Sequence, residues 1–101
     1  MAIFGSDGKN ANSNGGQTWW SDGSTQINSG NVIYDGDSTA TVSGNTMWTG
    51  NGTVTMNGNT FHGPDGVYTL SNGILYGPNG QSWSGVNNTQ DAMNIIAHKL
   101  K

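Results

Sequence analysis

A 14-residue period runs through the middle of this chain and limits what it can fold into. Large apolar residues recur at that spacing five times, and in each case the next residue carries a ring. The apolar positions are Trp19, Ile33, Met47, Phe61 and Leu75, and the ring positions are Trp20, Tyr34, Trp48, His62 and Tyr76. Self-similarity at a fixed short period is typical of repeat architectures, in which neighbouring units share one core. We therefore expect about five copies of a small structural unit.

Each unit contains two extended segments separated by turns. Residues 53–56 alternate polar and apolar with a period of two, which is typical of a half-buried strand. The Asn-Gly dipeptides at 57–58 and 72–73 favour two-residue hairpin turns, because a type I′ turn needs positive φ at both positions. The longer links at 63–66 and 77–80 begin with Gly-Pro and suit a type I turn. The pattern predicts a series of β-hairpins.

Hairpin pairing sorts the side chains onto two faces. A turn at 57–58 places Val54 opposite Phe61 and Thr53 opposite His62. One face of the hairpins is then apolar, and the other carries threonines and rings. We expect the apolar face to form the core, with Ala40, Val42, Met47, Val54, Met56, Phe61, Leu70 and Leu75 as its members.

The predicted fold class is all-β, with about five 14-residue hairpins arrayed around a shared core and a short C-terminal α-helix. A two-sided β-solenoid with 14-residue coils satisfies the same face assignments, and the chain-reversal signals in the turns favour the hairpins. We assign residues 1–16 to a flexible or edge segment, 17–86 to the repeat domain and 88–101 to an amphipathic helix. Asn88 is the expected N-cap of that helix, with Asp91 at its third position.

The core predicted from these repeats is thin. Apolar residues make up 32% of the 101 residues, against about 45–50% in an ordinary globular domain. A helix of about 12 residues is marginal on its own and must dock on another surface. We therefore expect a homo-oligomer that forms through the apolar strand face and the C-terminal helix.

Charge excludes several classes of partner. The chain has three lysines, no arginine and a net charge of −3, so it lacks the basic surface that nucleic acids and anionic membranes require.

The chain has no cysteine, which excludes disulfides and thiolate metal sites. The first residues lack the basic and apolar regions of a signal peptide, and no segment approaches about 18 apolar residues. Cytoplasmic location is the default expectation.

Catalytic and cofactor-binding patterns are weak. The nearest approach to a catalytic pair is His62 with Asp65, for which no nucleophile or orienting partner is indicated. The two carboxylates of Asp35 and Asp37 fit a turn better than a calcium loop, and no phosphate-binding glycine motif occurs. His98 is expected to be solvated or to cap the helix. We predict no enzymatic activity, no metal and no cofactor.

The ring positions carry the one binding hypothesis. Rings beside threonine and asparagine suit carbohydrates, whose apolar faces stack on aromatic side chains while their hydroxyls bond to polar neighbours. The tentative glycan surface comprises Trp20, Tyr34, Trp48, His62 and Tyr76. The predicted function is a non-enzymatic, oligomeric β-repeat protein with a structural or interaction role, and carbohydrate binding is the alternative. Ice binding and amyloid formation are weaker alternatives.

Two resemblances accompany this interpretation. Short hairpins with recurrent (Asp/Asn)-Gly turns and a terminal helix resemble the small bacterial β-flower proteins over roughly residues 17–85. That resemblance implies hairpin petals around a pseudo-symmetric axis and implies no catalytic residues. The heptads, such as residues 44–50, are similar to plant and insect ice-binding solenoids. Trp48, His62 and Tyr76 interrupt a face that those proteins keep small and flat.

Overall fold

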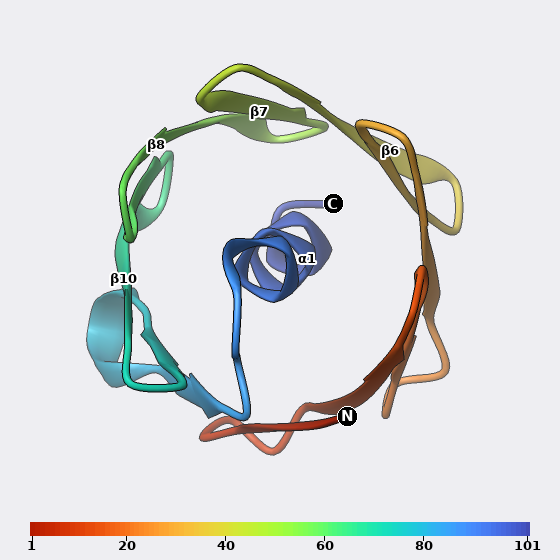
Figure 1. The fold of residues 1–101 in the computed structure, drawn as a ribbon, viewed down its shortest axis with the longest axis vertical. Coiled ribbons are helices and arrows are strands. Elements are labelled where there is room, and N and C mark those ends of the chain that lie inside the picture. The colour runs from red at the N-terminus through yellow and green to blue at the C-terminus, as the bar shows by residue number, and fades with distance from the viewer.

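Twelve antiparallel strands close into a barrel around the C-terminal helix in the computed structural model, which describes residues 1–101 (Figure 1). The strands are β1 (Ala2–Gly5), β2 (Asn10–Asn14), β3 (Gln17–Trp20), β4 (Thr25–Ser29), β5 (Val32–Asp35), β6 (Ser38–Ser43), β7 (Thr46–Thr49), β8 (Gly52–Asn57), β9 (Thr60–Gly63), β10 (Gly66–Ser71), β11 (Ile74–Tyr76) and β12 (Ser82–Ser84). A short 3-10 helix, η1 (Pro78–Gly80), precedes β12. Each strand pairs with its neighbours in sequence, and β12 pairs with β1. The all-β prediction is confirmed.

The predicted repeat count and the solenoid alternative are wrong. The barrel consists of six two-stranded units rather than five. The first two units are one residue longer than the others. Outward-facing rings at Phe4, Trp19 and Tyr34 are 15 residues apart, whereas those from Tyr34 to Tyr76 are 14 apart. A constant period of 14 therefore misses the first unit. Coils of a solenoid would stack in parallel, and every strand pair here is antiparallel.

The N-terminal segment belongs to the barrel. Residues 1–16, expected to be flexible or to form an edge, contain β1 and β2 instead. β1 pairs with β2 on one side and with β12 on the other, where Gly5 lies opposite Trp83. This closing pair joins residues about 80 positions apart, which no local pattern indicates. Because the barrel is closed, it has no edge strand.

The predicted turns and registers are partly confirmed. The turn at 72–73 is correct, and both of its residues have positive φ. The turn predicted at 57–58 lies one residue later, at 58–59, so that Met56 rather than Val54 is opposite Phe61. This changes the register by two residues, which leaves every side chain on its predicted face.

The apolar face of the strands forms the core, as predicted. Ala40, Met47, Val54, Phe61 and Leu75 are buried, and the partly buried Val42, Met56 and Leu70 pack against them. The side chains opposite them on each strand point out of the barrel.

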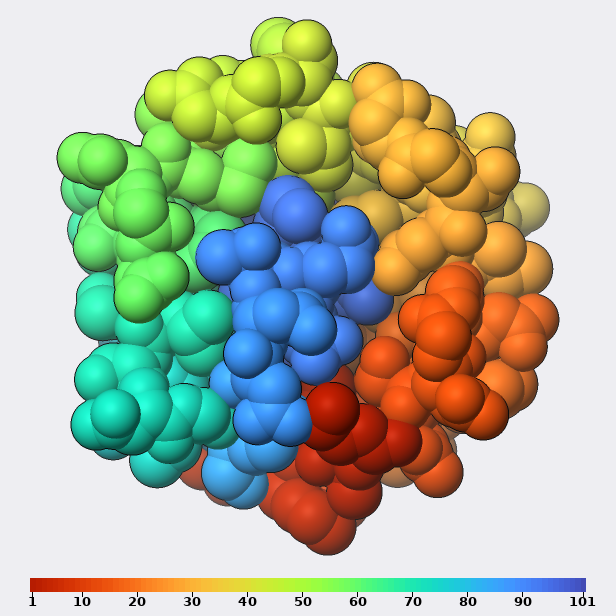
Figure 2. Space-filling view, viewed as in Figure 1, coloured from red at the N-terminus to blue at the C-terminus, as the bar shows by residue number.

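Helix α1 (Thr89–Lys99) lies inside the barrel and fills its centre (Figures 1 and 2). It begins as predicted, with the Asn88 side chain accepting a hydrogen bond of 2.8 Å from the backbone N–H of Asp91. Ile95 and Ile96 are fully buried against the wall. The helix thus supplies the core that the short strands lack. The two surfaces assigned to oligomerisation, the apolar strand face and the helix, cover each other within one chain.

A polar stripe fixes the rotation of α1. Asp91, Asn94 and His98 are spaced by three and four residues, so they share one face of the helix. This face meets polar side chains that β3 and β4 direct into the barrel. Gln26 donates a hydrogen bond of 2.7 Å to the backbone oxygen of Asn94, and the indole of Trp20 donates one of 2.8 Å to Gln26. The rotation brings His98 to the end of the barrel where β3 and β5 finish.

Neither the length nor the apolar character needed to cross a membrane is found in any helix of the structure.

Candidate functional site: the charged mouth and the outer wall

Charged side chains gather at one end of the barrel. The turns that follow the odd-numbered strands lie at this end, together with the C-terminus of α1. The chain has six aspartates and three lysines, and of these nine only Asp91 lies elsewhere, near the start of the helix. The opposite end presents mainly glycine, asparagine and serine turns.

A cavity of about 260 Å³ opens at this charged end. We call it the charged mouth, and its lining residues are Asp7, Lys9, Trp20, Asp22, Gln81, Trp83, His98, Lys99 and Lys101. All three lysines of the chain are among them. A protein with so few cationic side chains therefore places every one of its lysines around a single cavity.

His98 is held between two carboxylates. Its Nδ1 lies 2.7 Å from Asp35 Oδ2 and its Nε2 lies 2.9 Å from Asp22 Oδ2. Its ring stacks on Trp20, with 4.2 Å between the centroids and 6° between the planes. Both nitrogens donate in this arrangement only when the ring is an imidazolium. The expectation that His98 is solvated or caps the helix is wrong, because α1 lies inside the barrel and His98 is 7% exposed.

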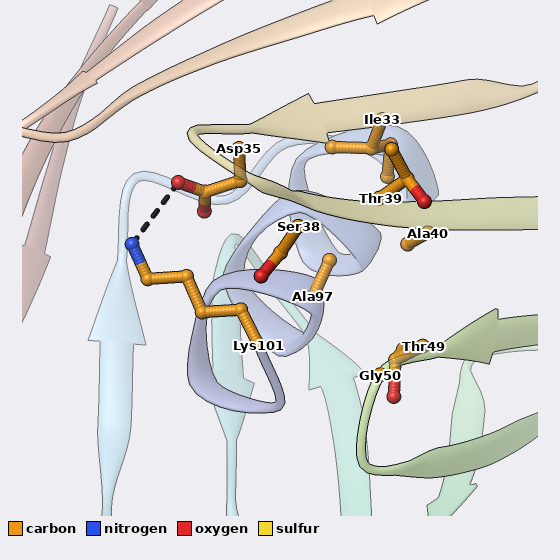
Figure 3. A pocket seen from close by; sticks show the side chains of 9 residues that line it. All are labelled: Ile33, Asp35, Ser38, Thr39, Ala40, Thr49, Gly50, Ala97 and Lys101. Atoms are coloured by element: carbon orange, nitrogen blue, oxygen red, sulfur yellow. Dashed lines mark hydrogen bonds and ion pairs between the residues drawn. The ribbon is translucent and has the colours of Figure 1, made fainter.

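The two carboxylates around His98 differ in their surroundings. The pKa of Asp22 is lowered to about 2, first because the backbone N–H of Ser24 donates to it at 2.9 Å and further through His98. Asp35 is buried and also receives the ammonium of Lys101 at 3.1 Å. Figure 3 shows Asp35 and Lys101 facing each other beside Ser38 and the end of α1.

Lys99 joins the helix to the opposite side of the mouth. Its Nζ donates a hydrogen bond of 2.5 Å to Gln81 Oε1 and lies 3.3 Å from Asp65 Oδ2. The same ammonium lies 5.0 Å from the ring centroid of Tyr68 and 5.4 Å from that of Trp83, which are cation–π distances. The hydroxyl of Tyr68 donates to Asp65 at 2.6 Å, and burial raises the pKa of Tyr68 far above its usual value.

The ionisable side chains of α1 and of Lys101 at the charged mouth are paired with side chains of the surrounding wall and turns. Both ring nitrogens of His98 face carboxylates, Nδ1 that of Asp35 and Nε2 that of Asp22. The ammonium of Lys101 lies 3.0 Å from Ser24 Oγ and 3.1 Å from Asp35 Oδ1.

Two residue pairs were considered in the sequence as a catalytic or a calcium site, and the members of each pair lie apart in the structure. His62 is exposed on the outer face of β9, whereas Asp65 lies in the following turn and bonds to Tyr68 and Lys99. Asp35 points into the barrel while Asp37 is exposed in the next turn. No group of three or more His, Asp or Glu side chains is placed to hold a metal ion.

The ring positions predicted as a glycan surface lie in two places. Tyr34, Trp48, His62 and Tyr76 are exposed on the outer wall. Trp20 is 6% exposed and lies inside the barrel, and Trp19 takes the corresponding outward position. The longer second unit causes this difference, because an odd change in spacing moves a strand residue to the other face.

The outer wall therefore carries one ring on every odd-numbered strand. We call this set the ring belt: Phe4, Trp19, Tyr34, Trp48, His62 and Tyr76. Between the rings stand mainly threonines and serines, such as Thr41 and Thr53, which lie opposite Trp48 on the neighbouring strands. The one charged residue within any strand, Asp35, points inward. The wall is thus free of Asp and Lys side chains.

Sequence reasoning missed the charged mouth and the first ring of the belt. Phe4 could have been found by allowing the period to change from 14 to 15. The mouth depends on where the helix lies, and no spacing in the sequence indicates that position. Comparison with protein-family models, with curated proteins and with solved structures gave no match to this chain.

Proposed function

We propose that this chain is a non-enzymatic interaction protein whose outer wall binds an uncharged polysaccharide. The observation that carries the proposal is the ring belt: six exposed rings, one on each odd-numbered strand, in a wall without Asp or Lys side chains. Rings stack on the apolar faces of sugars, and the hydroxyls around them exchange hydrogen bonds with sugar hydroxyls.

The absence of charge on the wall favours a neutral glycan. A uronic acid or sulfated sugar pressed against this wall would lose water around its charge without gaining an ionic partner, which is unfavourable. A neutral sugar loses only hydroxyl hydration, and threonines such as Thr41 and Thr53 beside Trp48 can replace those hydrogen bonds.

The spacing of the rings favours a polymer over a single sugar. Successive rings are two strands apart, which is about 10 Å around the circumference. Because the barrel curves, one straight chain faces neighbouring rings rather than the whole belt. Tyr34 and Trp48 are 45% and 47% exposed, so each ring offers one open side while the wall supports the other. Rings already held in place lose little conformational entropy on binding.

Self-association is the second candidate role of the same surface. Ile27 and Val67 are 44% and 48% exposed and lie opposite Tyr34 and His62 on adjacent strands. These pairs enlarge the apolar area around two of the rings, which favours contact with another protein surface. In this form the homo-oligomer predicted from the sequence would use the ring belt instead of the covered strand face.

The two roles are separated by one set of measurements. Binding is measured by affinity electrophoresis and calorimetry with cellulose- and chitin-derived oligosaccharides, soluble xylan and, as an anionic contrast, alginate. We expect Trp48→Ala to weaken binding of the neutral glycans by about fivefold, since one ring contact is worth about 1 kcal/mol. Combining it with Tyr34→Ala should remove detectable binding.

Val67→Ala is the matched control, because Val67 is exposed on the same wall and has no ring. It should leave glycan affinity unchanged. If no neutral glycan binds, or if Val67→Ala and Trp48→Ala behave alike, the carbohydrate proposal is rejected. Sedimentation of the same variants then tests self-association, which predicts a smaller species for Trp48→Ala than for the parent chain.

A further inference from the structure

The charged mouth has the composition of a separate binding site, distinct from the outer wall. Charged and polar side chains from the turns after β1, β3 and β11 and from the end of α1 meet the indoles of Trp20 on β3 and Trp83 on β12 around its cavity of about 260 Å³. It lies at the end of the barrel rather than on the wall that carries the ring belt. A ligand there would meet charges, which the wall does not offer.

Most carboxylate oxygens at the mouth are already engaged by the protein. Asp22 accepts from the backbone of Ser24 with one oxygen and faces His98 with the other. Asp35 contacts His98 and Lys101 through separate oxygens. These carboxylates hold the cations in place and have little capacity left to accept hydrogen bonds from a ligand.

Hydrogen-bond donors remain free around the same cavity. The ammonium of Lys9 makes no hydrogen bond or ion pair in the structure, and Gln81 uses its oxygen to accept from Lys99, which leaves its amide N–H groups unpaired. Lys99 and Lys101 each have three donors and two partners. The mouth therefore presents an excess of donors, which suits a ligand that accepts.

Asp7 limits the charge of that ligand. It lines the same cavity, and its Oδ1 accepts from the backbone N–H of Lys9 at 3.0 Å. A carboxylate at the rim repels each negative charge on the ligand, so the total repulsion grows with the ligand's charge. The walls formed by Trp20 and Trp83 are apolar, so electrostatic attraction is screened less here than on an open surface.

We propose that the charged mouth binds a small oxyanion, a molecule with one carboxylate or phosphate group, through Lys9, Gln81 and the free donors of Lys99 and Lys101. The ammonium groups neutralise the anion, and the Gln81 amide fixes its orientation. The site is complete within one chain.

The proposal is tested by two-dimensional NMR titration of the full chain with sodium acetate and, separately, with inorganic phosphate near pH 6, at constant ionic strength maintained with sodium chloride. We expect saturable shifts of the Gln81 side-chain amide and of the Trp83 indole N–H. Saturation by acetate alone assigns the site to carboxylates, and saturation by phosphate alone assigns it to phosphates. Absence of saturation with both anions overturns the proposal.

Two charge variants in the turn after β1 should change the affinity for the anion in opposite directions. Lys9→Gln removes the unpaired ammonium and should weaken binding by about tenfold, the effect of losing one charge-assisted hydrogen bond. Asp7→Asn keeps the acceptor for the backbone of Lys9 and should strengthen binding. Both residues are exposed, so the fold should be unaffected.

Asp37→Asn is the matched control, since Asp37 lies at the same end of the barrel and does not line the cavity. It changes net charge by the same amount as Asp7→Asn and should change affinity much less. Equal effects of these two variants would show a general field of the charged end, and an unchanged affinity in Lys9→Gln would show that Lys9 does not contact the anion. Either result would overturn the assignment of the site.

Discussion

Trp20 and His98 stack in parallel, 4.2 Å apart, across the junction between the barrel wall and the internal helix. The same indole donates to Gln26, which in turn donates to the backbone of Asn94. The helix is therefore joined to β3 and β4 by a ring contact and by a hydrogen-bonded chain. This arrangement explains why Trp20 is absent from the ring belt: its side chain positions the helix that brings His98, Lys99 and Lys101 to the mouth.

The two proposed binding surfaces, the outer wall and the charged mouth, differ in charge and suit different ligands. The wall is neutral and carries exposed rings, whereas the mouth concentrates the cations of the chain. Glycan and anion would then bind independently. Variants on the wall should leave anion binding unchanged, and variants at the mouth should leave glycan binding unchanged.

Replacing His98 should destabilise the fold strongly. In His98→Ala the buried carboxylate of Asp35 loses its contact with the ring nitrogen and keeps Lys101, and the stack on Trp20 is lost. Leaving a buried polar group short of a partner costs about 1–3 kcal/mol, and the lost ring packing adds to this, so we expect a loss of about 3 kcal/mol. The measurement is the free energy of unfolding in urea. A loss smaller than that of Lys101→Ala, which removes the more exposed partner, would contradict the central role given to His98.

Asp22 should make folding stability depend on pH in the acid range. Its pKa is about 2 in the folded chain against an ordinary value of 3.8, so its stabilising contribution is complete above about pH 4 and is lost as the pH falls through 2. The measurement is the difference in unfolding free energy between the parent chain and Asp22→Asn at several pH values. That difference should be constant near neutral pH and should shrink between pH 4 and pH 2. A difference that stays constant down to pH 2 would rule out the lowered pKa.

The glycine that leads from β12 toward the helix should tolerate no side chain. Gly85 has φ of +83°, and a Cβ at this position would lie 2.2 Å from the backbone oxygen of Ala2. Gly80 has a similar φ of +78° but no atom near such a Cβ, so Gly80→Ala is the matched control. We expect about 1 kcal/mol for Gly80→Ala from its backbone conformation alone and a clearly larger loss for Gly85→Ala. Thermal unfolding measures both, and equal losses would mean that Ala2 moves aside easily.

The face assignments could be predicted from the sequence because they depend on local alternation. Val54 and Phe61 are buried and Trp48 is exposed, as the pattern of their own strands indicates. A shift of two residues in register did not affect these assignments, since the strand period is two. Local information of this kind extends over one hairpin.

The position of the helix could not be predicted in this way. Its polar residues Asp91, Asn94 and His98 are typical of a face in water, but here they meet Thr18 and Gln26 inside the barrel. Whether a polar face contacts water or a polar interior depends on contacts between residues about 70 positions apart. The charged mouth depends on the same contacts, so it too became visible only with the fold.

Asn28 marks a position where the fold is less stable than it could be. Its Oδ1 is buried without a hydrogen-bond partner, beside a cavity of about 200 Å³ lined in part by Val42 and Met93. An unsatisfied buried polar atom costs about 1–3 kcal/mol, and an apolar side chain of similar length removes that cost and fills part of the space. We expect Asn28→Leu to raise the free energy of unfolding by about 1 kcal/mol. Asn45→Leu, in the exposed turn after β6, is the control and should give no gain, since Asn45 does not line this cavity. A loss of stability in Asn28→Leu would mean that the Asn28 side chain is satisfied by solvent that reaches the cavity.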